Sequence, residues 1–133
     1  MTKTLDQSVA DSSFQRAAAQ LPVADVEQAA NHYRDRFGFT IGGIWHDVPY
    51  AIVHRGGVEI HFCRDEHTGR PKQGGAYLVV DDADAVYEDL VARGAAPVNR
   101  PEDRFYGRRE FAVRDLDGYL ISLSSPVANE DAG

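Results

Sequence analysis

The sequence contains the same arrangement of elements twice, and this repeat limits the possible folds more than any other feature does. In each copy a strand-like run precedes an aspartate, and a glycine follows that aspartate 13 residues later: Asp25 and Gly38, then Asp81 and Gly94. Aspartate is a common N-cap of a helix, and glycine commonly ends one in the left-handed conformation. Each pair therefore predicts a helix that follows a strand.

The remaining elements are predicted from hydrophobic periodicity. In the first copy a strand at about residues 14–21 precedes Pro22 and Asp25, which open the helix, and strands follow at 40–45, 50–55 and 58–63. A polar stretch at 64–73 is predicted to be a linker. In the second copy Asp81 and Asp82 lead into the helix, and strands are predicted at 76–80, 96–99, 110–114 and 119–124.

Both copies thus have the order strand, helix, strand, strand, strand. Neither βαβββ unit can bury its own sheet face alone, so we expect the two units to pack together. The sequence predicts one α+β domain over residues 14–126, made of repeats at about 14–63 and 74–125. Residues 1–13 and 127–133 are predicted to be a loose arm and a frayed acidic tail.

Composition excludes several classes of function. A formal net charge of −7 argues against nucleic acid as a partner, because binding of phosphate backbones relies on an excess of lysine and arginine. The same charge would attract cationic ligands or serve solubility alone. The single cysteine, Cys63, cannot form an internal disulfide and suits a reducing compartment. With no apolar run long enough for a membrane span and no signal-peptide pattern, we expect a cytoplasmic protein without membrane contact.

Alternation along two strands predicts which side chains face a concavity. In residues 58–63 the apolar side chains alternate with Glu59, His61 and Cys63, and in the last strand Tyr119, Ile121 and Leu123 alternate with Leu120, Ser122 and Ser124. We expect the apolar faces to meet the helices and the polar faces to line the concavity.

Four segments resemble the vicinal oxygen chelate superfamily, which includes glyoxalase I, extradiol dioxygenases and bleomycin-resistance proteins. They are LPVAD at 21–25, YRDRFGF at 33–39, GVEIH at 57–61 and YGRREFAVRD at 106–115, and the resemblance covers about residues 15–125. It implies that the two repeats form an open cup of mixed sheets with the helices outside.

The resemblance also bears on metal binding. The positions where metalloenzymes of the superfamily carry their ligands are occupied here by Ala18, Glu59, Gly75 and Ser122. Only Glu59 can ligate, whereas a zinc site needs three or four protein ligands. The resemblance therefore implies no metal and no other cofactor. A rearranged metal site that uses Glu59 and His61 stays an alternative.

Without metal ligands, the sequence is most similar to the bleomycin-resistance branch, whose members sequester antibiotics in grooves between the subunits of a homodimer. In that branch an aromatic residue that stacks on planar rings precedes the glycine of the last motif, and Tyr106 has that position here. The segment at 40–44 lacks the acidic–aromatic pair of bleomycin binders, so another planar or aromatic ligand stays open. The predicted ligand-binding residues are Trp45, His46, Glu59, His61, Phe105, Tyr106, Arg109 and Ser122.

The alternative function is an enzyme of the same fold. Glu59 or His61 would act as acid or base on a small carbonyl or aromatic substrate. Cys63 lies on the same strand face as His61 at roughly 7 Å, too far for direct proton transfer, and is interpreted as structural. The Asp115–Gly118 segment is interpreted as a tight turn rather than a calcium loop. The sequence assigns no catalytic residue and leaves enzymatic activity open.

Overall fold

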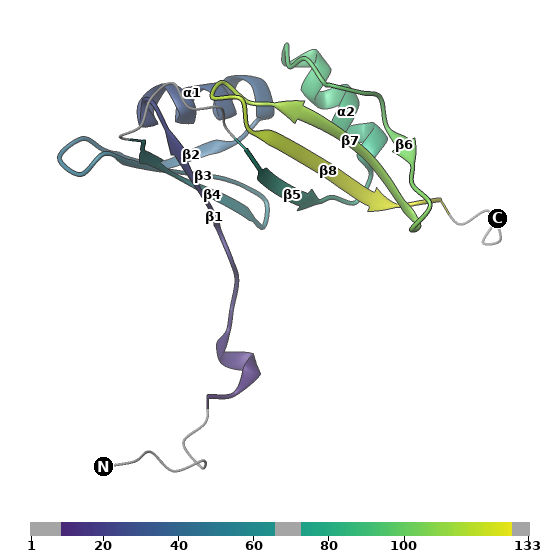
Figure 1. The fold of residues 1–133 in the computed structure, drawn as a ribbon, viewed down its shortest axis with the longest axis horizontal. Coiled ribbons are helices and arrows are strands. Elements are labelled where there is room, and N and C mark those ends of the chain that lie inside the picture. The colour runs from purple at the N-terminus through teal and green to yellow at the C-terminus, as the bar shows by residue number, and fades with distance from the viewer. Residues whose placement is uncertain (1–8, 66–72, 129–133) are drawn as a thin grey trace.

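The fold, described by a computed structural model for residues 9–65 and 73–128, is α+β with two similar halves (Figure 1). A 3-10 helix, η2 (Asp11–Ser13), comes before the first half. The first half contains β1 (Ala19–Val23), α1 (Val26–Phe37), β2 (Thr40–Trp45), β3 (Tyr50–Arg55) and β4 (Val58–Arg64). The second contains β5 (Gly75–Val79), α2 (Ala83–Ala92), β6 (Glu102–Asp103), β7 (Arg108–Arg114) and β8 (Leu120–Pro126).

Strand pairing is the same in the two halves. The strand orders are β1-β4-β3-β2 and β5-β8-β7-β6, with β1–β4 and β5–β8 parallel and the other pairs antiparallel. The edge strands β1 and β5 contact each other, and both helices lie on the same side of the two open, curved sheets (Figure 1). The predicted βαβββ repeat and α+β fold are therefore confirmed.

The helix boundaries follow from their caps. Asp25 accepts a hydrogen bond from the backbone N–H of Gln28 at 3.0 Å, and Gly38 ends α1 with φ 73°. In α2 the N-cap is Asp82, which accepts from the backbone N–H of Ala85 at 3.2 Å. These side-chain acceptors satisfy backbone donors that have no partner inside the helix.

The first strand begins later than predicted. Strand β1 starts at Ala19 and includes Pro22, because β4 pairs with it only from Ile60 to Arg64. Residues 9–18 are exposed and extend away from both sheets (Figure 1). The rest of the predicted arm, the linker residues 66–72 and the tail residues 129–133 lie outside the described residues.

The strand predicted at 96–99 is wrong. That segment makes one isolated bridge, Pro97 to Val113, and the strand beside β7 is the short β6 instead. The side chain of Asn99 accepts a hydrogen bond from the backbone N–H of Ala112 at 3.0 Å, so a side chain replaces the backbone partner that a strand would supply.

The apolar faces of both sheets pack under the helices, as predicted. Ile60 and Phe62 of β4, and Ile121 and Leu123 of β8, are buried in one continuous core. Polar contacts join the halves as well: the Tyr33 hydroxyl of α1 donates to Asp115 Oδ2 at 2.7 Å. The predicted tight turn at 115–118 is confirmed by the hydrogen bond from the Gly118 N–H to the Asp115 carbonyl at 3.0 Å.

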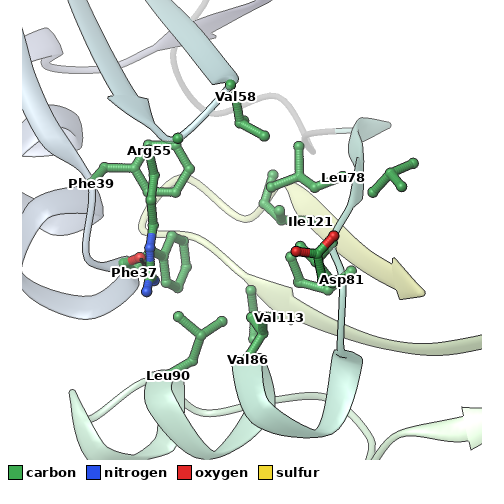
Figure 2. A pocket seen from close by; sticks show the side chains of 15 residues that line it. Phe37, Phe39, Arg55, Val58, Leu78, Asp81, Val86, Leu90, Val113 and Ile121 are labelled. Carbon is green, nitrogen blue, oxygen red and sulfur yellow. Dashed lines mark hydrogen bonds between the residues drawn. The ribbon is translucent and has the colours of Figure 1, made fainter.

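A cavity of about 390 Å³ lies between the halves (Figure 2). Apolar side chains of both halves line most of it, including Phe39, Leu78 and Leu90. The guanidinium of Arg55 is engaged at its wall, donating to the Phe37 carbonyl at 2.8 Å and to Asp89 at 2.9 Å. The cavity lining includes none of the predicted site residues. Within the described residues, no helix has the length and apolarity needed to cross a membrane.

Candidate functional site

The sheet faces that point away from the helices carry the candidate site, and we call them the first and second open faces. The first open face includes Gln20 of β1, Tyr50 of β3, and Glu59 and His61 of β4. Strand register places His61 between Gln20 and Ile52, so side chains from three strands meet there. Alternation predicted this face for Glu59 and His61.

A series of hydrogen bonds crosses the first open face. The Gln20 amide donates to the Tyr50 hydroxyl oxygen at 3.0 Å. The Tyr50 hydroxyl in turn donates its own proton to His61 Nδ1, which lies 2.6 Å away. With Nδ1 as acceptor, His61 Nε2 carries the proton donated to Glu59 Oε2, also at 2.6 Å. This bond lowers the pKa of the Glu59 carboxyl, against the opposing effect of desolvation and with help from Arg16 at 3.7 Å.

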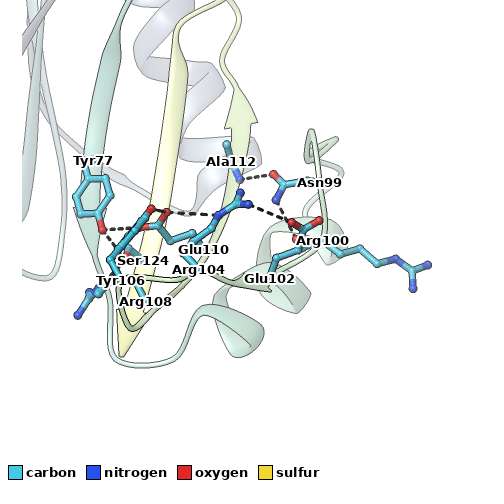
Figure 3. Close-up of polar contacts among 10 residues, drawn as sticks. All are labelled: Tyr77, Asn99, Arg100, Glu102, Arg104, Tyr106, Arg108, Glu110, Ala112 and Ser124. Carbon is cyan, nitrogen blue, oxygen red and sulfur yellow. Dashed lines mark hydrogen bonds and ion pairs between the residues drawn. The ribbon is translucent and has the colours of Figure 1, made fainter. Parts of the chain in front are cut away.

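The second open face contains a carboxylate held by two tyrosines (Figure 3). The Tyr77 hydroxyl of β5 donates to Glu110 Oε2 at 2.5 Å, and it lies 2.7 Å from Ser124 Oγ of β8. The Tyr106 hydroxyl donates to Glu110 Oε1. Burial alone would raise the pKa of Glu110, but the hydrogen bonds from Tyr106 and Tyr77 outweigh it, so the pKa is lowered. The carboxylate is therefore held ionised within the face.

Large aromatic side chains stand exposed beside both polar groups. Trp45, 49% exposed, ends β2 and lines a hollow of about 300 Å³ with His46 and Tyr50. Phe105 and Tyr106 lie in the turn before β7, with Tyr106 52% exposed and Phe105 fully exposed. Exposed rings of this kind can stack on a planar ligand.

The predicted site residues fall into two groups in one chain. Trp45, His46, Glu59 and His61 belong to the first sheet and the turn after β2, whereas Phe105, Tyr106 and Ser122 belong to the second. Ser122 lines a hollow of about 600 Å³ on the second open face.

Arg109 is placed differently from the other predicted residues. It lies on the helix side of β7, where it bonds Asp84 of α2 at 2.7 Å and Asp103 of β6 at 3.0 Å. In this position its side chain connects both α2 and β6 to β7. A role of Arg109 in ligand binding stays a prediction.

Sequence reasoning missed Tyr50, Tyr77 and Glu110. Alternation could have indicated Glu110, because it lies in a predicted strand. Tyr50 begins a predicted strand and shares its open face with Ile52. Tyr77 lies opposite Ser122 only through the parallel pairing of β5 with β8, which no local pattern reveals.

Comparison with known families shows which protein superfamily the chain belongs to. The model of the Glyoxalase/Bleomycin resistance protein/Dioxygenase superfamily matches residues 15–123, which span both βαβββ halves. The chain belongs to this superfamily. The predicted resemblance is thus confirmed, and the bleomycin-resistance branch is supported by individual relatives.

Among members of the superfamily, a bleomycin resistance protein of Geobacillus stearothermophilus is 28% identical over 125 residues, covering 80% of this chain and 93% of that protein. A bleomycin-binding protein of Streptomyces verticillus, solved with copper(II)-bleomycin, is 27% identical with a TM-score of 0.72 and covers 86% of this chain and 98% of its own. The bleomycin resistance determinant encoded on transposon Tn5 is 25% identical with a TM-score of 0.72, covering 86% and 100%.

The residues at the metal-ligand positions of the superfamily do not fit a metal ion. Ala18, Gly75 and Ser122 accompany Glu59, which already bonds His61. A side chain at position 75 is also excluded sterically, because a Cβ there would lie 1.8 Å from the Leu120 carbonyl oxygen. Among the described residues, no three histidine, cysteine or acidic side chains are grouped as a metal site.

Proposed function

We propose that this chain binds a planar aromatic small molecule, with bleomycin-like antibiotics as the first candidates, and sequesters it without a metal. The observation that carries the proposal is the exposure of Trp45 and Tyr106 beside hydrogen-bonded polar groups on the open faces. The relatives named for binding bleomycin support the class of ligand.

The two open faces offer complementary contacts to such a ligand. Trp45 and Tyr106 would stack on planar rings, which contributes about 0.5–1.5 kcal/mol for each pair beyond burial of area. His61 and Glu59 would supply polar contacts at the ring edges. Their hydrogen bonds to each other and to Tyr50 hold these groups in place before a ligand arrives, which lowers the entropic cost of binding.

We further propose that a second copy of the chain completes the groove. The open faces lie side by side in one chain, and they leave Trp45, Tyr77 and Tyr106 about half exposed. A homodimer with the first face of one chain over the second face of the other would enclose a ligand from both sides. Sedimentation velocity should then give a dimer; a monomer that binds ligand with full affinity would contradict this part alone.

Calorimetric titration with metal-free bleomycin and a panel of planar antibiotics tests the binding proposal. We expect Tyr106→Ala to weaken binding of the ligand by about 1–3 kcal/mol while the fold is retained. The matched control is Val91→Ala, which removes an exposed apolar side chain from the outer helix α2 and should leave affinity unchanged. Equal affinity of the wild type and Tyr106→Ala would remove Tyr106 from the site.

A second candidate function is acid–base catalysis on a small carbonyl or aromatic substrate. The series Tyr50–His61–Glu59 favours it, because Glu59 orients His61 and His61 in turn can accept the Tyr50 proton. Turnover of a carbonyl or phenol panel, lost in Glu59→Gln and Tyr50→Phe with binding retained, would support an enzyme. Binding without turnover supports sequestration.

A further inference from the structure

Arg108 on the second open face has hydrogen-bond donors that nothing in the described chain satisfies. Its Nε donates to Ser124 Oγ at 2.9 Å, the single hydrogen bond that its side chain makes with described residues. Nη2 is buried, and it has no acceptor among those residues. A buried guanidinium donor without an acceptor is costly, since it has lost water without gaining a replacement.

Three arginines near Arg108 in the chain each have partners. Arg104 pairs with Glu102 at 3.1 Å, Arg109 with Asp84 and Asp103, and Arg114 donates to the Gly118 carbonyl at 2.9 Å. The guanidinium groups of these three arginines are therefore already bonded within the chain. Arg108 forms no ion pair within the described chain.

Glu110 does not neutralise Arg108 either. It lies two residues along β7 on the same face, but its oxygens accept from Tyr77 and Tyr106. Ser124 connects Arg108 to the aromatic part of the face, because its hydroxyl contacts both the Arg108 guanidinium and the Tyr77 hydroxyl. An unpaired guanidinium thus lies beside Ser124 and Tyr77, and Tyr77 shares Glu110 with Tyr106, a ring proposed to stack on the ligand (Figure 3).

We propose that Arg108 binds an anionic group of an aromatic ligand, such as a carboxylate, sulfonate or phosphate. A guanidinium can offer two parallel N–H donors to such a group, which makes the contact strong and directional. Ser124 fixes the guanidinium through Nε, and a small rotation of the Arg108 side chain would bring the buried Nη2 to the ligand. This inference rests on the proposed function and names the ligand chemistry that the second face selects.

Because the chain is acidic overall, recognition of an anionic ligand would depend on direct contact with Arg108. A net charge of −7 repels anions at long range, but salt screens that repulsion beyond about 8 Å. An acidic ligand would therefore be recognised through contact with Arg108 rather than by electrostatic attraction from a distance. We therefore expect the preference for an acidic aromatic compound to appear as a slower rate of dissociation.

Two fluorescent probes that differ in one anionic group provide the test. Anilinonaphthalene sulfonate and phenylnaphthylamine share their aromatic rings, and only the first carries a sulfonate. We expect Arg108→Gln to weaken binding of the sulfonate probe about tenfold, the loss typical of a charge-assisted hydrogen bond, and to leave binding of the neutral probe within about twofold. Arg34→Gln, on the exposed surface of helix α1 and away from both open faces, is the matched control and should change neither affinity.

The melting temperature without probe shows whether the variants fold. Arg108→Gln should melt at or above the wild-type temperature, because it removes a buried donor, Nη2, that has no acceptor among the described residues. A folded Arg108→Gln that binds the sulfonate probe as tightly as the wild type would overturn the anion site, while neutral-probe binding that needs Tyr106 would keep the proposed function. Neutral-probe affinity unchanged by Tyr106→Ala would instead count against the proposed function itself.

Discussion

At the residue scale, Asp115 connects the last turn to the first helix in a buried position. Its Oδ2 accepts from the Tyr33 hydroxyl at 2.7 Å, and its Oδ1 accepts from the backbone N–H groups of Asp117 and Tyr119. Burial raises the pKa of Asp115 above its usual value of 3.8, although these hydrogen bonds act in the opposite direction. Folding therefore disfavours the ionised form of Asp115 relative to the unfolded chain.

This raised pKa gives stability a definite dependence on pH. A carboxyl with a raised pKa contributes stability below the unfolded-state value, and that contribution is lost as pH rises through the folded-state value. Unfolding free energies of the wild type minus those of Asp115→Asn should therefore fall as pH rises from about 3.8. Chemical denaturation of both proteins across pH 3 to 8, roughly the range that linkage covers, measures this. A difference that stays flat or grows would show that the hydrogen bonds prevail over burial.

Tyr77 makes a second prediction at this scale. Tyr77→Phe removes one of the two tyrosine donors to Glu110, so we expect a loss of about 1–2 kcal/mol in unfolding free energy at neutral pH. Because Tyr106 shares the same carboxylate, adding Tyr106→Phe should cost an amount that is not the sum of the single changes. Strict additivity in urea denaturation would mean that the two hydroxyls act independently.

At the scale of elements, the pairing of β5 with β8 depends on glycine at position 75. Gly75→Ala would place a Cβ 1.8 Å from the Leu120 carbonyl oxygen, and backbone atoms cannot yield as a flexible side chain can. We expect a loss of about 1–3 kcal/mol, the usual range for overpacking. Gly57→Ala is the control, because a Cβ there meets nothing within 4 Å. Equal melting temperatures for the two variants would contradict the crowding argument.

Elements were predictable where the signal is local. Asp25 and Gly38 mark the ends of α1, and alternation assigns Ile60 and Phe62 to the core. Where long-range pairing decides, prediction failed: β1 begins at Ala19 only because its partner β4 offers that register. Residues 96–99 form no strand because the Asn99 side chain takes the place of a backbone partner.

For the whole molecule, the repeat and the motifs were enough to predict two βαβββ halves with their helices outside the sheets. They also predicted that Glu59 and His61 face away from the core, as they do. What they could not predict is the partner of each polar group, since Tyr50 reaches His61 and Tyr77 reaches Glu110 across strands. For Arg109, alternation predicts the side of β7 opposite to Glu110. It does not predict the partner Asp84, because that contact depends on how α2 packs against the sheet.

The fluorescence of Trp45, the only tryptophan, tests the central claim most directly, because this ring stands on the proposed site. Titration with metal-free bleomycin and planar antibiotics, followed together with the melting temperature, is predicted to give saturable quenching and a raised melting temperature for at least one compound. A ligand that binds only the folded state must stabilise it. No saturable change and no shift in melting temperature across the panel would contradict sequestration of a planar ligand at the open faces.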